Sequence, residues 1–263
     1  MSIPLAYALW GLIVGVLVGL TGVGGGSLMT PILVLVFGLP PAVAVGTDLL
    51  FSASTKLVAT ASFGFSRRVD WRIVARLAVG SIPAAAAVIL WFWLDHRPPG
   101  IVDELISRCL AVILGVAAVA LLLHDSWRRW GLRFTATWFI GNERHIVLLT
   151  VLAGLLLGVG VTMTSVGAGA LGVAALVALY PLRLPSDRLV ATDIAHALPI
   201  TAIAAAGHAV LGHVDLRALA CLLVGSIPGV LIATHATIRF PPQLTRTLIA
   251  IMLAVVSARL FAA

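Results

Sequence analysis

Three ionisable side chains lie inside otherwise apolar segments: Asp48, Lys56 and Asp193, and His196 follows three residues after the second aspartate. An ionisable group in the middle of a membrane segment costs at least about 2.5 kcal/mol, so it is a functional candidate by default. Lys56 is the only lysine in the protein. Its charge suits an anion, whereas Asp48, Asp193 and His196 could carry or gate protons. His196 shares a helical face with Asp193, where the carboxylate could orient its ring.

The two aspartates and the lysine also have structural interpretations. Asp48 and Asp193 follow Thr47 and Thr192, and a threonine N-cap followed by an aspartate favours the start of a helix. If Asp48 begins its helix, Lys56 lies about 12 Å deeper and a direct pair between them is strained. Lys56 then needs a partner from another segment or a bound anion. Its structural alternatives are a buried ion pair and a side chain that reaches the membrane interface.

Two stretches of small residues, 21–28 and 164–171, each precede a short apolar segment. Free backbone amides and the positive end of a helix dipole would point at an anion there, although the same glycines could serve close helix packing. Nucleotide binding is excluded because no Walker lysine is present. Beside Lys56, the predicted substrate-binding residues are Thr21, Gly24, Gly25, Gly26, Ser27, Thr164, Ser165, Gly167 and Gly169.

Composition identifies the solvent around these segments. The 263 residues are 61% hydrophobic and 10% charged, whereas soluble domains carry about 25% charged residues. The chain is therefore an integral membrane protein, and its first segment reads as retained rather than as a cleaved signal. Cys109 and Cys221 lie in apolar runs without metal-ligand spacing, so no metal site and no cofactor is predicted. The net charge of +7 comes from arginines beside the spans, so nucleic acid is not an expected partner.

The chain is a duplicated half. "VDWRIVARLAVGSIP" at 69–83 matches "VDLRALACLLVGSIP" at 214–228, an offset of 145 residues, and "LP…VGTDL" at 39–49 matches "LP…VATDI" at 184–194. "TGVGGGSL" at 21–28 aligns with "TSVGAGAL" at 164–171 at an offset of 143. Such internal repeats are typical of membrane transporters that bind substrate between their halves.

Each half contains about five apolar segments, of which the last three are long enough to cross a membrane of about 30 Å. We expect an all-α polytopic membrane protein with short broken helices after the glycine-rich stretches. The segments are expected at 4–20, 27–38, 48–66, 72–94 and 105–123, and at 146–160, 166–181, 190–210, 216–235 and 243–262.

Arginine placement predicts that the second half is inverted relative to the first. If 67–76 is cytoplasmic, alternation makes 124–145, 182–188 and 236–246 cytoplasmic as well, and these four regions hold twelve arginines against four on the opposite side. Positive charge accumulates on the inside, so both termini are expected outside. An odd number of crossings per half gives this inverted topology.

The two membrane repeats, 1–123 and 146–263, are joined by a linker at 124–145. In the linker, Trp127, Trp130 and Trp138 alternate with arginines. This pattern is typical of an amphipathic segment that lies on the inner membrane surface. The expected partners are the lipid bilayer and a small anion, and the sequence leaves open whether the protein forms a homodimer.

At these residues the chain resembles the sulfite exporter TauE/SafE family. The resemblance covers nearly the whole chain and rests on "GLTGVGGGSLMTPIL", "VGTDLLFSASTK", "VDWR…GSIP", "TSVGAGAL", "ATDIAHALP" and "VDLR…GSIPG" in duplicated order. It implies a multi-pass carrier of the bacterial inner membrane that exports sulfite or organosulfonates. The second glycine stretch has lost glycines relative to the first, so we expect the first to contribute more to binding.

The expected mechanism is alternating access by two inverted halves that carry a small sulfur-containing anion outward with proton coupling. A passive anion channel is the first alternative. An intramembrane hydrolase is the second, and it lacks both an H-E-x-x-H motif and a G-x-S-x-G nucleophile turn. The protein is therefore not expected to be an enzyme.

Overall fold

A computed structural model gives the fold. It describes residues 3–21, 26–63, 69–95, 98–123, 126, 127, 129, 132, 143–181, 183–235 and 242–262. All regular secondary structure in these residues is helical, as expected. The helices are α1 (Ile3–Thr21), α2 (Gly26–Leu35), α3 (Pro41–Phe63), α4 (Trp71–Leu94), α5 (Pro99–Leu122), α7 (Glu143–Thr164), α8 (Ala170–Leu179), α9 (Ser186–Val210), α10 (Leu216–His235) and α11 (Pro242–Ala262).

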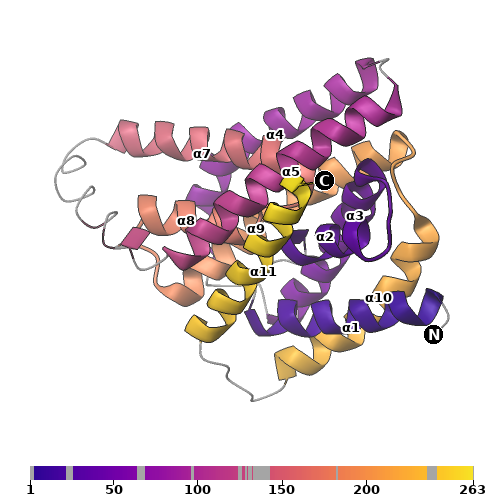
Figure 1. The fold of residues 1–263 in the computed structure, drawn as a ribbon. Helices are drawn as coiled ribbons and strands as arrows, with labels where there is room; N and C mark the ends of the chain where they lie inside the picture. The colour runs from indigo at the N-terminus through magenta and orange to yellow at the C-terminus, as the bar shows by residue number, and fades with distance from the viewer. Residues whose placement is uncertain are drawn as a thin grey trace.

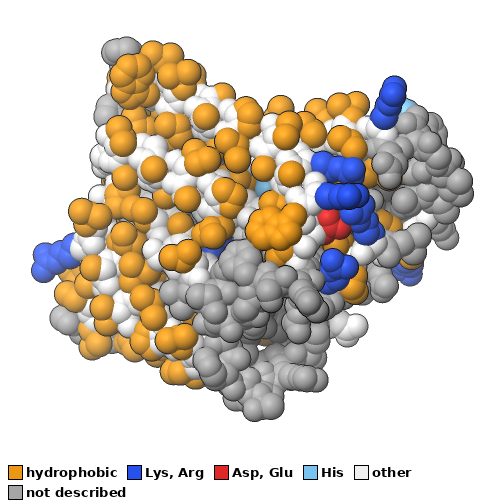
Figure 2. Space-filling view, turned by 180° about the vertical axis from the view of Figure 1, so that it is seen from behind, with side chains coloured by type: hydrophobic (Ala, Val, Ile, Leu, Met, Phe, Trp, Pro, Cys, Tyr) orange, Lys and Arg blue, Asp and Glu red, His pale blue; other side chains and the backbone are white. Residues whose placement is uncertain are grey.

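Five of the described helices are long and apolar enough to cross a membrane, within α4, α5, α7, α9 and α10. Large apolar side chains such as Trp93, Leu156 and Phe261 face outward. Figure 2 shows a face dominated by hydrophobic side chains, on which most of the visible Lys and Arg side chains lie toward one side. An exposed surface of this kind is stable in lipid and costly in water. The protein is a multi-pass membrane protein.

The short helices lie close to where the sequence predicts them, but several helix starts differ: α5 begins at Pro99 rather than at residue 105, and α8 at Ala170 rather than at 166. α2 and α8 have 10 residues each, too few to cross about 30 Å of hydrocarbon. α3 begins at Pro41 rather than at residue 48, and α9 at Ser186 rather than at 190. Thr47, Asp48, Thr192 and Asp193 therefore lie inside helices, and their interpretation as N-cap and first-turn residues is wrong.

Two closely packed helix pairs form opposite sides of the molecule. In Figure 1, α1 and α10 run along one side, and α4 and α7 run along the other. Glycines allow the approach: a Cβ on Gly11 would lie 2.2 Å from the Leu222 carbonyl oxygen, and one on Gly154 would lie 2.2 Å from that of Leu77. Small residues at such interfaces let helix backbones come into contact in lipid.

The remaining helices fill the space between these pairs. α3 packs on α9 at the centre, α2 lies on α3, α8 lies on α9, and α5 packs on α11. α9 also contacts α4. In the same way, α3 contacts α10, which is the repeat equivalent of α4. Each half thus packs against the other in a reciprocal way, so the ionisable residues of α3 and α9 lie at the interface between the halves.

Most of the linker at 124–145 lies outside the described residues, with only its last residues in α7 and a few isolated positions placed. Its amphipathic character and the domain boundaries on either side of it stay predictions.

Candidate functional site

The chain between α7 and α8 is a break in the helix, built from residues with unusual backbone angles. Ser165 has a φ of 59°, Gly167 of 121° and Gly169 of 120°. Glycine suits the latter two positions because positive φ strains other residues. Gly169 is the N-cap of α8 and provides no side-chain hydrogen bond. The first amides of α8 therefore have no local side-chain acceptor, as in an anion-binding helix start.

Asp48 lies beside this break and is held by several donors. The backbone amide of Thr30 donates to Asp48 Oδ2 at 3.0 Å, and the Thr30 hydroxyl donates to the same oxygen. The Ser52 hydroxyl donates to Oδ1 at 3.2 Å. The Ser165 hydroxyl lies near the same carboxylate but is buried without a well-formed hydrogen bond. Hydrogen bonds of this kind favour the ionised form of a carboxyl group, whereas burial disfavours it.

Lys56 lies between two carboxylates from different helices. It interacts electrostatically with Asp193 of α9 and, less strongly, with Asp48 two turns earlier in α3. Within the described residues, neither carboxylate approaches the ammonium to within 4 Å, since the ion pairs at that distance are Arg108–Glu104 and Arg183–Asp70. Asp48, Lys56, Asp193 and His196 are each at most 4% exposed. Three buried ionisable groups thus lie close together inside α3 and α9.

Asp193 differs from Asp48 in its hydrogen bonding. Its Oδ1 is buried and has no hydrogen-bond partner in the part of the chain that the structure describes. The same oxygen faces Gly172 of α8, where a Cβ would lie 1.9 Å away. Only glycine leaves room for the carboxyl group at this position. Asp193 therefore lies against α8, the helix that follows the break, and also interacts electrostatically with Lys56.

His196 forms a contact between helices at the same depth. Its Nε2 lies 3.0 Å from the Ser81 hydroxyl of α4. Its repeat counterpart is Phe51, and the counterpart of Ser81 is Ser226, whose hydroxyl is buried without a partner in the described residues. The second half alone thus carries an imidazole at this position.

The predicted glycine sites are only partly described. Gly24 and Gly25 lie outside the described residues, as do the side-chain surroundings of Thr21, Gly26 and Ser27. In the second stretch, Thr164 donates to the Gly160 carbonyl at 2.7 Å and accepts from the Val166 amide at 3.2 Å. Its hydroxyl thus stabilises the turn. Ser165, Gly167 and Gly169 form the break itself.

Polar contacts between the halves lie near the start of each central helix, α3 and α9. Thr47 accepts a hydrogen bond from the Asp215 amide at 2.9 Å, and its counterpart Thr192 accepts one from the Asp70 amide at 3.1 Å. Asp70 also forms an ion pair with Arg183 at 2.9 Å. The threonines that the sequence suggested as local caps thus bind the helix starts of the opposite half.

His208 was not among the residues predicted from the sequence, and it is fully buried in the last turn of α9. Its Nε2 lies 3.0 Å from the Thr162 carbonyl, so this nitrogen carries the proton. Its Nδ1 lies 3.4 Å from Nδ1 of His213. Burial lowers the pKa of His213, and nearby Asp103 partly opposes that shift. The cost of a buried ionisable residue in a span would have identified His208 from sequence.

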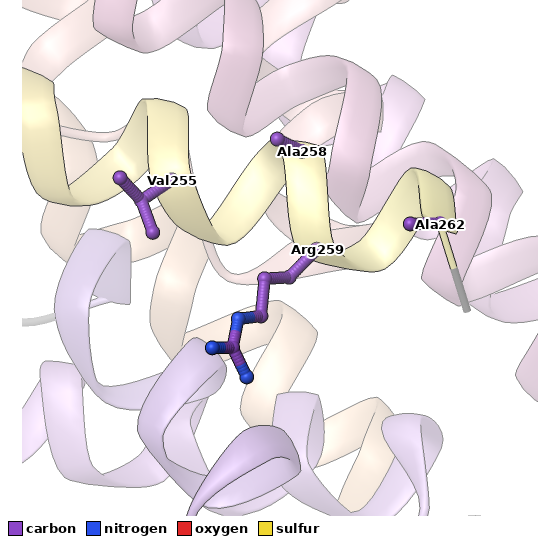
Figure 3. Close-up of a pocket in the computed structure, with 4 residues that line it drawn as sticks. All are labelled: Val255, Ala258, Arg259 and Ala262. Carbon is purple, nitrogen blue, oxygen red and sulfur yellow. The ribbon is translucent and has the colours of Figure 1, made fainter.

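Two further observations concern the surface groove on α11 and possible metal ligands. Figure 3 shows a groove at the end of α11, lined by Val255, Ala258, Arg259 and Ala262, and the Arg259 side chain projects away from its helix. This groove shares no lining residue with the buried cluster. Among the described residues, no three His, Cys, Asp or Glu side chains are placed to hold a metal ion.

Comparison with known proteins identifies relatives along almost the whole chain. It is 39% identical over 235 residues to the "Probable membrane transporter protein YjnA" of Bacillus subtilis (strain 168), covering 89% of this chain and 91% of the relative. A "Probable membrane transporter protein" of Xylella fastidiosa (strain 9a5c) is 28% identical over 119 residues, which is 45% of this chain and 42% of that protein. No solved structure matches the chain.

The family comparison agrees with the duplicated motifs and the helical fold. The model of the family described as "Sulfite exporter TauE/SafE" matches residues 7–260. This range includes both helix breaks and all the buried ionisable residues. The chain therefore belongs to the TauE/SafE family of membrane transporters.

Proposed function

We propose that the protein is a secondary transporter, and not an enzyme, that exports a small sulfur-containing anion such as sulfite or an organosulfonate across the bacterial inner membrane. The observation that carries this proposal is Lys56, a buried cation that lies between Asp48 and Asp193 without a close ion pair to either. An anion would neutralise its charge at low cost, because the desolvation of the ammonium is already part of the folded state.

The helix breaks supply the rest of the proposed binding site. Amides at the start of α8, and of α2 in the first half, would hydrogen-bond the oxygens of the anion. Ser165 supports this role because its hydroxyl is buried, near Asp48 and without a well-formed hydrogen bond. Sulfite and sulfonates present several oxygens in a compact group, which suits a ring of amides and one cation.

Coupling to protons follows from the charges of the cluster. With both carboxylates ionised, one ammonium and two carboxylates leave the cluster negative, which repels an anion. A proton taken up by the cluster removes that repulsion. Asp48, Asp193 and His196 are the groups proposed to carry or gate it.

Alternating access requires two halves that can exchange roles. The reciprocal pairs, α1 with α10 and α4 with α7, support an inverted repeat that moves about the central helices. In the proposed topology both termini lie outside and the linker at 124–145 lies inside. A cysteine placed at Thr135 of the linker should not react with a membrane-impermeant reagent added to the outside of intact cells. Labelling under those conditions contradicts the topology.

Flux into and out of proteoliposomes tests the function. Sulfite, sulfate, thiosulfate and sulfoacetate should be compared, and an imposed proton gradient should drive at least one of them against its concentration gradient. Movement that only dissipates a gradient would indicate a passive anion channel. No flux of any of these anions would contradict the proposed substrate class.

A further inference from the structure

The two repeat-equivalent aspartates are in different chemical environments. Asp48 receives three hydrogen bonds, two from Thr30 and one from Ser52. In the second half the equivalent positions are Val173 and Ala197, neither of which has a side-chain donor. The second copy of the duplicated site therefore lacks both of these side-chain donors.

The hydrogen bonding of Asp193 agrees with this difference in donors. Its Oδ1 is buried and has no hydrogen-bond partner in the described residues. An ionised carboxylate in an apolar environment needs donors or a close cation. Its nearest cation, Lys56, is beyond ion-pair distance and is shared with Asp48. The neutral acid is better suited to this position than it is to that of Asp48.

We propose that Asp193 is the carboxyl group that takes up and releases the coupled proton, while Asp48 stays ionised as the fixed counter-charge of Lys56. This assignment rests on the proton-coupled anion transport proposed above, and it separates two residues that the duplicated sequence presents as equivalent.

The charged groups around this carboxyl group come from few elements. α3 contributes Lys56, and α9 contributes His196, whose Nε2 is engaged by Ser81 of α4. The Asp70–Arg183 ion pair lies near the start of α9, where the Asp70 amide donates to the hydroxyl of Thr192, the residue before Asp193. α8 has no ionisable side chain, and α7 has none beyond its first turn. α4 carries Arg72 and Arg76 near its start, and the first turn of α9 carries Asp187 and Arg188. Of these charged groups, Lys56 is the one that interacts electrostatically with Asp193.

The assignment predicts that proton and anion bind together. A proton on Asp193 leaves Lys56 and Asp48 as a neutral pair, so an anion can approach the ammonium without net repulsion. Linkage is reciprocal, so a bound anion must favour the protonated acid by the same free energy. A monoanion that crosses with this proton moves no net charge, and its own concentration gradient can drive its export.

Binding of sulfoacetate to the purified full-length protein tests the assignment, because sulfoacetate keeps its charge across the neutral pH range. At pH values where Asp193 is ionised, wild-type affinity should fall about tenfold per pH unit, and each bound anion should take up one proton. Asp193→Asn should bind at alkaline pH as tightly as the wild type does at acidic pH, without proton uptake. Asp48→Asn removes one negative charge beside Lys56, so this variant should still take up a proton on Asp193, with the fall in affinity moved to lower pH.

Two further variants separate the proton site from general structural effects. Val173→Thr with Ala197→Ser would place the two side-chain donors of Asp48 at the equivalent positions beside Asp193, and the fall in affinity should move to lower pH. These changes conserve volume, and thermal unfolding checks that the double variant is folded. His196→Gln should keep the wild-type slope, because the imidazole is not the proton carrier in this assignment.

The outcomes distinguish this inference from the proposed function. A wild-type protein that binds none of sulfoacetate, sulfite, sulfate and thiosulfate contradicts anion transport itself. Anion binding that is independent of pH contradicts only the proton site. A wild-type slope in Asp193→Asn, or loss of the slope in Asp48→Asn, overturns the assignment to Asp193.

Discussion

The outer helix pairs and the buried centre have diverged to different extents since the chain was duplicated. A Cβ on Gly11 or on its equivalent Gly154 would meet a carbonyl oxygen at the same 2.2 Å, so both pairs keep the same close contact. At the centre, the equivalent of Lys56 is Thr201 and the equivalent of His196 is Phe51. The glycine contacts between helices are thus the same in both halves, whereas the ionisable residues at the centre differ.

This difference has a physical reason in a carrier that alternates between two states. If each half takes the place of the other, the contacts at both sides must be similar in strength, or one state would be strongly preferred. The substrate site faces no such demand, because a single cation and a single proton site between the halves serve both states.

The largest expected effect comes from removing the central charge. Lys56→Met should abolish anion flux while the protein stays inserted, and Lys56→Arg should retain partial flux at best because a guanidinium is larger and planar. Thr201→Val, at the equivalent position, should keep wild-type flux. Flux in proteoliposomes measures all three, and undiminished transport by Lys56→Met would leave this residue with a structural role only.

The symmetric packing predicts an equal loss of stability when either helix pair is disturbed. Gly11→Ala and Gly154→Ala should each reduce stability by about 1–3 kcal/mol, because the added methyl group forces the backbones apart. Gly100→Ala is the matched control, since a Cβ there meets no atom within 4 Å. Thermal unfolding in detergent provides the measurement. A large difference between the two damaging variants would show that the pairs are not equivalent.

The glycine stretches test whether asymmetry extends to the helix breaks. Gly25→Val should weaken anion binding more than Ala168→Val, because a side chain at residue 25 would cover amides that are already partly covered in the second half. Gly25 lies outside the described residues, and Ala168 is buried. Expression and thermal stability must accompany affinity, since either valine could disturb packing. Equal weakening in two folded variants contradicts the asymmetry.

The smallest effect is expected at the reciprocal threonines. Thr47→Val and Thr192→Val each remove the acceptor for a backbone amide of the opposite half, at a cost of about 1 kcal/mol each. The two sites belong to different contacts, so the double variant should show an additive loss. Denaturation of the single and double variants measures this, and strong non-additivity would indicate that the two contacts are coupled.

Much of the fold could be predicted from the sequence. Composition identified the membrane protein, apolar segment lengths predicted the short helices α2 and α8, and the rule against buried charge selected Asp48, Lys56 and Asp193. The same rule also selects the buried His208. These predictions succeed because the cost of burying charge and the length of a helix depend on the local chain alone.

The start of α3 could not be predicted in this way. Its first turn is held by Asp103, which accepts a hydrogen bond from the Ala42 amide at 2.9 Å from a position 61 residues later in the chain. The local pattern instead offered Thr47 as a cap. That threonine instead accepts a hydrogen bond from the Asp215 amide of the other half. The start of α3 is thus bound by a residue distant in the chain, and so is the start of α10.

The residue types along the chain identify the buried ionisable residues and show that they come from a duplicated half. Their partners on other helices depend on the packing, because Thr30 of α2 reaches Asp48 of α3, while Gly172 of α8 leaves room for an oxygen of Asp193 that has no donor in the described residues. A hydrogen bond depends on distances of a few tenths of an ångström between separate helices. No pattern of residue types along one chain specifies distances of that kind.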